Sequence, residues 1–142
     1  MMNTSGEQAK QQIIYKLNEQ ITPKELSTVF KNSGIRRPID DLPRLKRMIE
    51  NGDLLITARV HDKLVGVARA ITDFSYCCYL SDLAVDQQYQ KQGIGKELIR
   101  LVQEQITDEV TLLLLSSPVA MEYYPRVGFE KVENGYRILR KK

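Results

Sequence analysis

The stretch at residues 83–96 reads LAVDQQYQKQGIGK. It starts as an apolar strand, Leu83 to Val85, passes through a polar turn containing Gly93 and Gly95, and continues as an amphipathic helix. Glycines at a strand-to-helix turn let backbone N–H groups approach an anion, and the helix N-terminus adds a partial positive charge. The stretch therefore predicts a cradle for a phosphate group, with a merely tight turn as the alternative.

The spacing in this stretch excludes two common nucleotide motifs. A Walker A loop needs a glycine at position 90 and a serine or threonine at position 97, where the sequence has Gln90 and Glu97. A dinucleotide-binding fingerprint needs a third glycine at position 98, where the sequence has Leu98. The predicted phosphate ligand is therefore neither a P-loop nucleotide nor a Rossmann dinucleotide.

The rest of the chain reads as alternating strands and helices of a mixed α/β sheet. Thr22, Pro23 and Glu25 predict the start of a helix through a capping box, and Asn134-Gly135 is typical of a two-residue hairpin turn. The expected strands are 13–17, 54–60, 64–71, 77–85, 110–115, 129–132 and 136–139, and the expected helices begin near 23, 41, 93 and 119.

Composition limits the chemistry that the chain can perform. The sequence has 142 residues, 42% hydrophobic and 27% charged, as expected for a single domain over 1–142, with a flexible N-terminus at 1–12. It contains one His, two Cys and no Trp, too few for a structural zinc site or a Cys-His mechanism. We expect no metal, and chemistry from carboxylates, hydroxyls, backbone amides or a bound cofactor.

Location and partners follow from the same residues. Adjacent Cys77 and Cys78 are poorly placed for a disulfide, and neither an apolar leader nor a run of about 18 apolar residues is present, so we expect a cytoplasmic protein without a membrane partner. The net charge of +3, with a basic end at 137–142, favours a solvated tail over a nucleic-acid site.

Three segments resemble one known family, the GCN5-related N-acetyltransferases (GNAT). Residues 90–95, QKQGIG, resemble its Q/R-x-x-G-x-G/A pyrophosphate loop, residues 83–86 resemble its fourth strand, and residues 123–129, YYPRVGF, are similar to its late F-Y-x-x-x-G-F segment. The resemblance extends from about Ile13 to the end of the chain. It implies a single mixed, mostly antiparallel sheet flanked by helices, with splayed fourth and fifth strands, and it allows a homodimer.

The resemblance also implies acetyl-CoA as co-substrate. Its pantetheine arm would pair with the backbone of the fourth strand, opposite residues 112–115, and amides at 91–96 would hold the pyrophosphate. Ser117 stands where the family often has asparagine, and its hydroxyl could bond the pantetheine or a water. The implied cofactor-binding residues are Leu83, Ala84, Val85, Gln90, Lys91, Gln92, Gly93, Ile94, Gly95, Lys96, Ser117 and Tyr124.

Two catalytic residues are expected from the resemblance and from acid–base chemistry. Tyr124 matches the tyrosine that protonates the departing thiolate, while Tyr123 is expected in the core. The backbone N–H near Leu83 would polarise the thioester carbonyl. An acceptor ammonium must lose a proton, and Asp82 is the expected general base, with orientation of a loop or helix as its alternative role and Glu122 as a weaker candidate.

The expected reaction is transfer of an acetyl group to a primary amine of a small molecule or protein, directly within a ternary complex. The alternative is a non-catalytic acyl-CoA-binding or regulatory module. The resemblance places the acceptor near residues 33–41 and 73–79. There Arg36 and Arg37 could meet a carboxylate on the acceptor or could simply be solvated.

Overall fold

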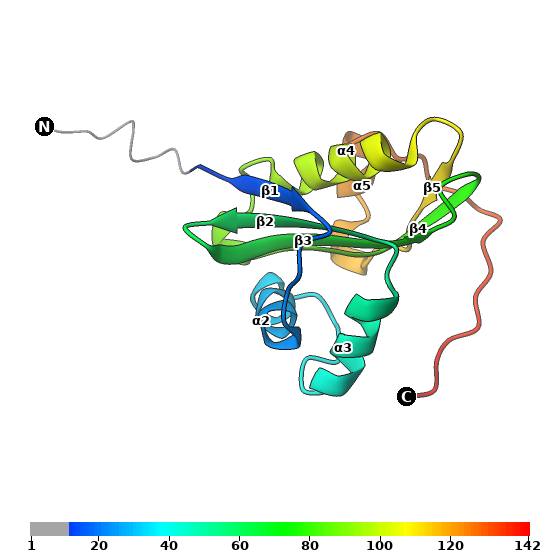
Figure 1. Ribbon diagram of the computed structural model, residues 1–142. Helices are drawn as coiled ribbons and strands as arrows, with labels where there is room; N and C mark the ends of the chain where they lie inside the picture. The colour runs from blue at the N-terminus through cyan, green and yellow to red at the C-terminus, as the bar shows by residue number, and fades with distance from the viewer. Residues whose placement is uncertain (1–11) are drawn as a thin grey trace, which may run out of the picture.

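A computed structural model describes residues 12–142 (Figure 1). Its centre is a five-stranded sheet in the order β1-β2-β3-β4-β5, in which the first four strands are antiparallel and β5 is parallel to β4. This confirms the expected mixed, mostly antiparallel sheet. The strands are β1 (Ile14–Leu17), β2 (Leu54–Val60), β3 (Lys63–Thr72), β4 (Cys77–Val85) and β5 (Thr111–Leu113).

Helices cover both faces of the sheet. Figure 1 shows α4 above the sheet and α2 and α3 below it. The short α5 packs against the core on the α4 side. The helical elements are α2 (Pro23–Ser33), α3 (Leu42–Asn51), η1 (Gln87–Tyr89), α4 (Ile94–Ile106), η2 (Pro118–Ala120) and α5 (Tyr123–Arg126).

The helix ends on the α2/α3 face follow the sequence signals. The Thr22 hydroxyl accepts from the Glu25 N–H at 3.0 Å, and the Glu25 carboxylate accepts from the Thr22 N–H at 3.0 Å. This is the expected capping box, and such a cap is worth about 1 kcal/mol. Gly34 ends α2 in the left-handed region, and the Asp41 carboxylate caps α3.

Two apolar cores lie on opposite faces of the sheet. The larger one joins the sheet to α4, whose inward residues follow the helical period. The smaller one joins the sheet to α2 and α3. The residues of α4 in the larger core are Ile94, Leu98, Ile99, Val102 and Ile106, and the buried residues of α2 are Leu26, Val29 and Phe30.

A bulge at Ser81 divides β4 into two halves. Arg69 pairs with Asp82 and Ala70 pairs with Leu80, so Ser81 has no partner in β3. A bulge shifts the alternation of side chains by one residue. Leu80 therefore faces the α4 core, whereas Asp82 faces α2 and α3.

The C-terminal hairpin expected at 129–139 is not formed. Within residues 12–142, no strand follows α5, and the side chains of Tyr136 and Ile138 are fully exposed. A two-stranded hairpin is marginal unless it packs on a further strand or helix, and residues 130–142 are all exposed in this structure. The helix expected at 119–126 is divided into η2 and α5. The flexible N-terminus was expected at 1–12, of which residues 1–11 lie outside the described residues.

Candidate functional site

The turn between β4 and α4 presents free backbone amides. Gly93 precedes α4 in the left-handed region with φ of 85°, and no side chain caps the helix. The first bond of the helix runs from the Glu97 N–H to the Gly93 carbonyl at 3.0 Å. The N–H groups of Ile94, Gly95 and Lys96 therefore have no acceptor in the helix and can bind an anion.

Two side chains hold this turn against the end of β4. The Asp86 carboxylate accepts from the Gln88 N–H at 2.8 Å, and Gln90 donates its side-chain amide to the Val85 carbonyl at 3.0 Å. Lys63 lies 3.5 Å from the other Asp86 oxygen. These contacts anchor the turn to the end of β4, so the strand fixes the position of the cradle.

The two glycines of the turn are needed for different reasons. A Cβ at Gly93 would meet nothing within 4 Å, so only its positive φ favours glycine there. A Cβ at Gly95 would stand 2.8 Å from the Tyr123 hydroxyl, closer than real Cβ contacts. Gly95 therefore lets α5 pack against the first turn of α4, and Tyr123 contributes to the shape of the cradle.

A gap opens between β4 and β5 beside the cradle. The two strands pair only where residues 77–79 meet residues 111–113. The N–H of Asp86 donates to Val65 in β3 at 2.8 Å, so the alternate residues Leu83 and Val85 direct their backbone groups away from β3. Because β5 is absent at this level, the backbone of Leu83 faces the gap.

The side chains of this half of β4 divide between the two cores. Leu83 and Val85 pack against the α4 core, and Ala84 lies in the α2/α3 core. Ser117 lies four residues after the end of β5, precedes η2, is exposed, and makes no capping bond. Its hydroxyl is therefore free to meet a ligand.

Tyr124 lies in an aromatic cluster on α5. Its ring makes edge contacts with Tyr123 at 5.3 Å and with Phe129 at 5.4 Å between centroids. Burial raises the pKa of Tyr124 above its ordinary value of 10.0, although the charge of Arg37 acts in the opposite direction. The phenol is therefore protonated at neutral pH and can donate a proton.

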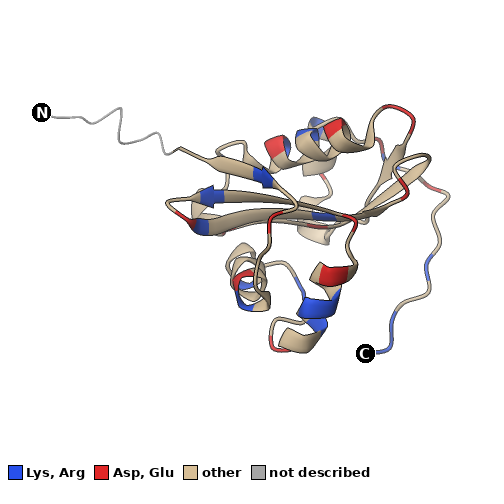
Figure 2. Ribbon diagram, viewed as in Figure 1, with Lys and Arg blue, Asp and Glu red and all other residues tan. Residues whose placement is uncertain are grey.

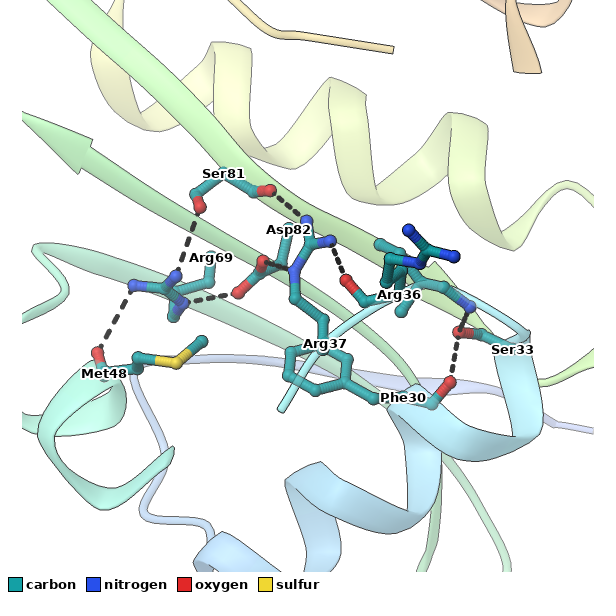
Figure 3. Close-up of polar contacts among 9 residues, drawn as sticks. Phe30, Ser33, Arg36, Arg37, Met48, Arg69, Ser81 and Asp82 are labelled. Carbon is teal, nitrogen blue, oxygen red and sulfur yellow. Dashed lines mark hydrogen bonds and ion pairs between the residues drawn. The ribbon is translucent and has the colours of Figure 1, made fainter. Parts of the chain in front are cut away.

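Asp82 is fully buried between two arginines (Figure 3). Its Oδ1 accepts from Arg37 Nε at 2.6 Å, and its Oδ2 accepts from Arg69 Nε at 2.5 Å. Arg37 also donates to the Ser81 carbonyl at 2.7 Å, and Arg69 donates to the Met48 carbonyl at 3.4 Å. The carboxylate thus links β3, β4, α3 and the α2–α3 loop.

These contacts favour the alternative role of Asp82 over that of a general base. Both of its oxygens are engaged and no face of the side chain is exposed, so an acceptor ammonium has no approach to it. The Arg37 guanidinium is likewise engaged, because it donates to Asp82 and to the Ser81 carbonyl, which argues against its meeting a carboxylate on the acceptor. Arg36 remains exposed on the same loop.

Arg69 was absent from the sequence-based site, although the sequence held a signal for it. Residues 64–71 and 77–85 are otherwise apolar strands, and each contains one charged residue, Arg69 and Asp82. Buried charges are normally paired, so two opposite charges in two neighbouring buried strands predict an ion pair.

The cations near the cradle are exposed and available. Lys91 and Lys96 are solvent-accessible, and neither enters an ion pair within residues 12–142. A hollow of about 240 Å³ continues from Gly93 along α4 to Val127. Gly93 and Lys96 belong to the cradle and also line this hollow. Among the described residues, no group of three or more His, Cys, Asp or Glu is placed to hold a metal ion.

The site thus combines an open β4 edge with an anion cradle at the start of α4. The profile described as Acetyltransferase (GNAT) domain matches residues 7–137. This match covers most of the chain, and the chain therefore belongs to the GNAT acetyltransferase family.

Two relatives illustrate the similarity in sequence. The chain is 28% identical over 127 residues to an uncharacterized N-acetyltransferase, ycf52, of Pyropia yezoensis, covering 84% of this chain and 71% of the relative. It is 27% identical over 142 residues to the probable acetyltransferase TAP2 of Glycine max, covering 89% of this chain and 55% of the relative. The chain thus spans about half the length of the soybean protein.

Solved structures share the fold. A GNAT family acetyltransferase, SP0256, from Streptococcus pneumoniae TIGR4 superposes with a TM-score of 0.73 at 20% identity, covering 92% of this chain and 100% of the other. The aminoglycoside N-acetyltransferase AAC(6')-Iy, solved in complex with CoA, superposes with a TM-score of 0.70 at 16% identity, covering 94% and 97%. At these identities the likeness concerns the fold.

No helix in the described part of the chain is both long enough and apolar enough to cross a membrane.

Proposed function

We propose that this chain transfers an acetyl group from acetyl-CoA to a primary amine, directly within a ternary complex. The observation that carries the proposal is the backbone of Leu83, which faces an open gap leading to the cradle at Gly93. An extended arm bearing amides is a natural partner for an unpaired strand edge. The cradle at the end of this gap suits the pyrophosphate of the same molecule.

In this proposal, different residues bind different parts of the cofactor. The amides at 91–96 and the side chains of Lys91 and Lys96 hold the pyrophosphate, with Gln90 fixing the turn. Leu83 and Val85 pair with the pantetheine arm, and Ser117 bonds it with its hydroxyl. The hollow beside Val127 takes the remaining end of the cofactor.

The chemical step uses one backbone N–H group and one phenol. The N–H near Leu83 polarises the thioester carbonyl, and the amine nitrogen forms a bond to that carbon while the carbon–sulfur bond breaks. Tyr124 gives its proton to the departing sulfur, since a phenol with a pKa above 10 can protonate a thiolate. The ammonium gives one proton to water before the attack, and the second proton, which the nitrogen loses as the amide forms, restores the phenol.

Asp82 acts as a positioning residue in this proposal. By holding Arg37 to the Ser81 carbonyl, it fixes the α2–α3 loop against the bulged part of β4. This loop borders the side from which the acceptor is expected. Solvent therefore takes the ammonium proton.

The acceptor is proposed only as a class. Two relatives point in different directions, since one solved neighbour is named an aminoglycoside N-acetyltransferase and a soybean relative is named a histone acetyltransferase. Amino sugars and lysine-containing peptides are therefore both placed in the test panel. A cytoplasmic location remains a prediction from the sequence.

The test is thiol release from acetyl-CoA across this panel, with CoA binding measured separately by calorimetry. We expect amine-dependent release that falls about 100-fold in kcat for Tyr124→Phe, with CoA affinity retained. Tyr136→Phe, which changes a fully exposed tyrosine, is the matched control. Tight CoA binding without amine-dependent release would favour the non-catalytic module, and full activity of Tyr124→Phe would remove the phenol from the mechanism.

A further inference from the structure

The start of α4 rests on a glycine of the sheet. Gly66 lies in the interior of β3, and Ile94, the first residue of α4, is only 1% exposed. A Cβ added at Gly66 would stand 3.1 Å from Ile94 Cγ2 and 3.4 Å from Leu98 Cδ1. The φ of Gly66 is not positive, so this position favours glycine for space and not for backbone conformation.

An added methyl group at Gly66 would displace the helix. Ile94 is β-branched and lies in a helix, where one χ1 rotamer dominates, so its Cγ2 atom cannot simply rotate away from β3. On the sheet side the added atom would also stand 3.4 Å from the Cβ of Ala58, which is opposite Gly66 in β2. The first turn of α4 would therefore move away from the sheet by a few tenths of an ångström.

The buried face of α4 sets its distance from the sheet. Figure 2 shows the charged residues of α4 in red and blue. Within residues 12–142 their ion pairs stay on the helix, from Arg100 to Glu97 at 2.8 Å and to Glu104 at 3.1 Å. No ion pair therefore holds α4 to the sheet, and the contact between Ile94 and Gly66 sets the height of the first turn.

The same glycine adjoins both parts of the proposed cofactor site. Its strand partner is Val85, whose backbone lies at the open edge of β4. Its packing partner is Ile94, whose N–H belongs to the cradle. One ligand that binds both parts gains affinity only if their spacing lets it engage them at the same time. The distance between the edge and the cradle therefore matters as much as either part alone.

We propose that Gly66 is a positioning residue that sets the spacing between the open edge of β4 and the anion cradle. The inference rests on the proposed function, in which CoA spans the two. Gly66 itself touches no part of the cofactor and acts through Ile94. A misplacement of 1 Å can cost about 100-fold, so a few tenths of an ångström should cost about fivefold.

The test compares three ligands on the unmodified chain and on Gly66→Ala, by calorimetry for CoA and by NMR titration for the two weaker ligands. CoA spans both parts, ADP offers a pyrophosphate to the cradle alone, and pantetheine offers its arm to the gap alone. We expect Gly66→Ala to bind CoA about fivefold more weakly and to bind ADP and pantetheine within twofold of the unmodified chain. Gly52→Ala is the matched control, because its Cβ would be similarly close, 3.3 Å from Arg69 Cγ, but lies beside α3.

A rescue variant and a reciprocal variant separate spacing from folding. Ile94→Leu moves the branch from Cβ to Cγ and removes the Cγ2 atom at similar volume, so the double variant with Gly66→Ala should recover CoA affinity to within twofold. Ile94→Ala changes the same contact from the helix side and should weaken CoA about fivefold, with ADP within twofold. Ile106→Ala, at the far end of α4 in the same core, should leave both affinities within twofold.

Three results would overturn the inference: unchanged CoA affinity in Gly66→Ala, equal weakening of all three ligands, or a loss that Ile94→Leu does not restore. If Gly66→Ala does not fold, unchanged CoA affinity in Ile94→Ala overturns it instead. An unmodified chain that binds no CoA would overturn the proposed function together with this inference. Every measurement is a binding constant, so a chain that binds CoA without transferring acetyl contradicts only the proposed function.

Discussion

Arg69 and Asp82 are directly opposite one another in the β3–β4 ladder, and their side chains form an ion pair of 2.5 Å in the protein interior. Arg37 completes the site from the α2–α3 loop, so a single carboxylate serves two guanidinium groups. Such an arrangement is costly to break, because removing the carboxylate leaves buried positive charge without a partner.

Asp82→Asn should therefore destabilise the fold strongly. We expect a loss of about 3 kcal/mol in the free energy of unfolding, near the lower end of the range for a broken buried pair because Arg37 is partly exposed. Urea denaturation followed by circular dichroism measures the loss. Asp62→Asn, in an exposed turn with φ of 67°, is the matched control and should change stability by less than about 0.5 kcal/mol. Equal effects of the two substitutions would contradict the assignment.

Arg37→Lys separates positioning from folding. Lysine keeps the positive charge beside Asp82 but loses the forked contact to the Ser81 carbonyl. We expect the KM for the amine to rise about tenfold while the affinity for CoA stays within twofold, because the cradle lies on another part of β4. Steady-state kinetics and calorimetry give the two values. A parallel loss of both affinities would indicate a general structural defect.

Gly95→Ala should damage the cradle, and a second substitution should repair it. The added Cβ would stand 2.8 Å from the Tyr123 hydroxyl, whereas the next ring atom is 3.7 Å away. We expect CoA to bind about tenfold more weakly to Gly95→Ala, and binding of the double variant Gly95→Ala with Tyr123→Phe to return to within twofold. If removal of the hydroxyl fails to restore binding, Gly95 is needed for close approach of the ligand itself.

Alkaline pH should weaken the fold through Tyr124. Burial raises the pKa of Tyr124 above its ordinary value of 10.0, and this contribution to stability is complete below about pH 10. It is lost as the pH rises through the folded-state pKa, because the unfolded chain then binds fewer protons than the folded one. The free energy of unfolding, measured from pH 8 to 11, should fall less steeply for Tyr124→Phe than for the unmodified chain. Tyr136→Phe should leave the slope unchanged.

The sequence predicted most of the fold because its signals were local. The capping box at Thr22 and Glu25, the period of α4 and the glycines at 93 and 95 each concern neighbouring residues, and each corresponds to an element in the structure. The prediction of a hairpin at Asn134-Gly135 was wrong. A hairpin needs a strand or helix to pack on, and the turn residues contain no information about that surface.

The candidate site was predictable in its backbone and less so in its side chains. The position of the cradle follows from residues 90–96 alone. The partners of Asp82 do not, because Arg37 is 45 positions away along the chain and reaches it only through the packing of α2 and the loop that follows. Charge pairing between distant segments is decided by the three-dimensional arrangement, so the sequence left two roles open for Asp82.

The unpaired residue Ser81 lets one strand serve both apolar cores. Leu80 and Asp82 are two positions apart and would share a face in a regular strand, but the extra residue between them leaves Leu80 toward α4 and Asp82 toward α2 and α3. A deletion of Ser81 would make Leu80 and Asp82 neighbours, and simple alternation would then keep each on its present face, whereas a deletion elsewhere in β4 would turn residues between that position and the bulge to the opposite face. Among relatives of this protein, a gap within β4 should therefore fall at Ser81, and other gaps should fall in the turns on either side of the strand.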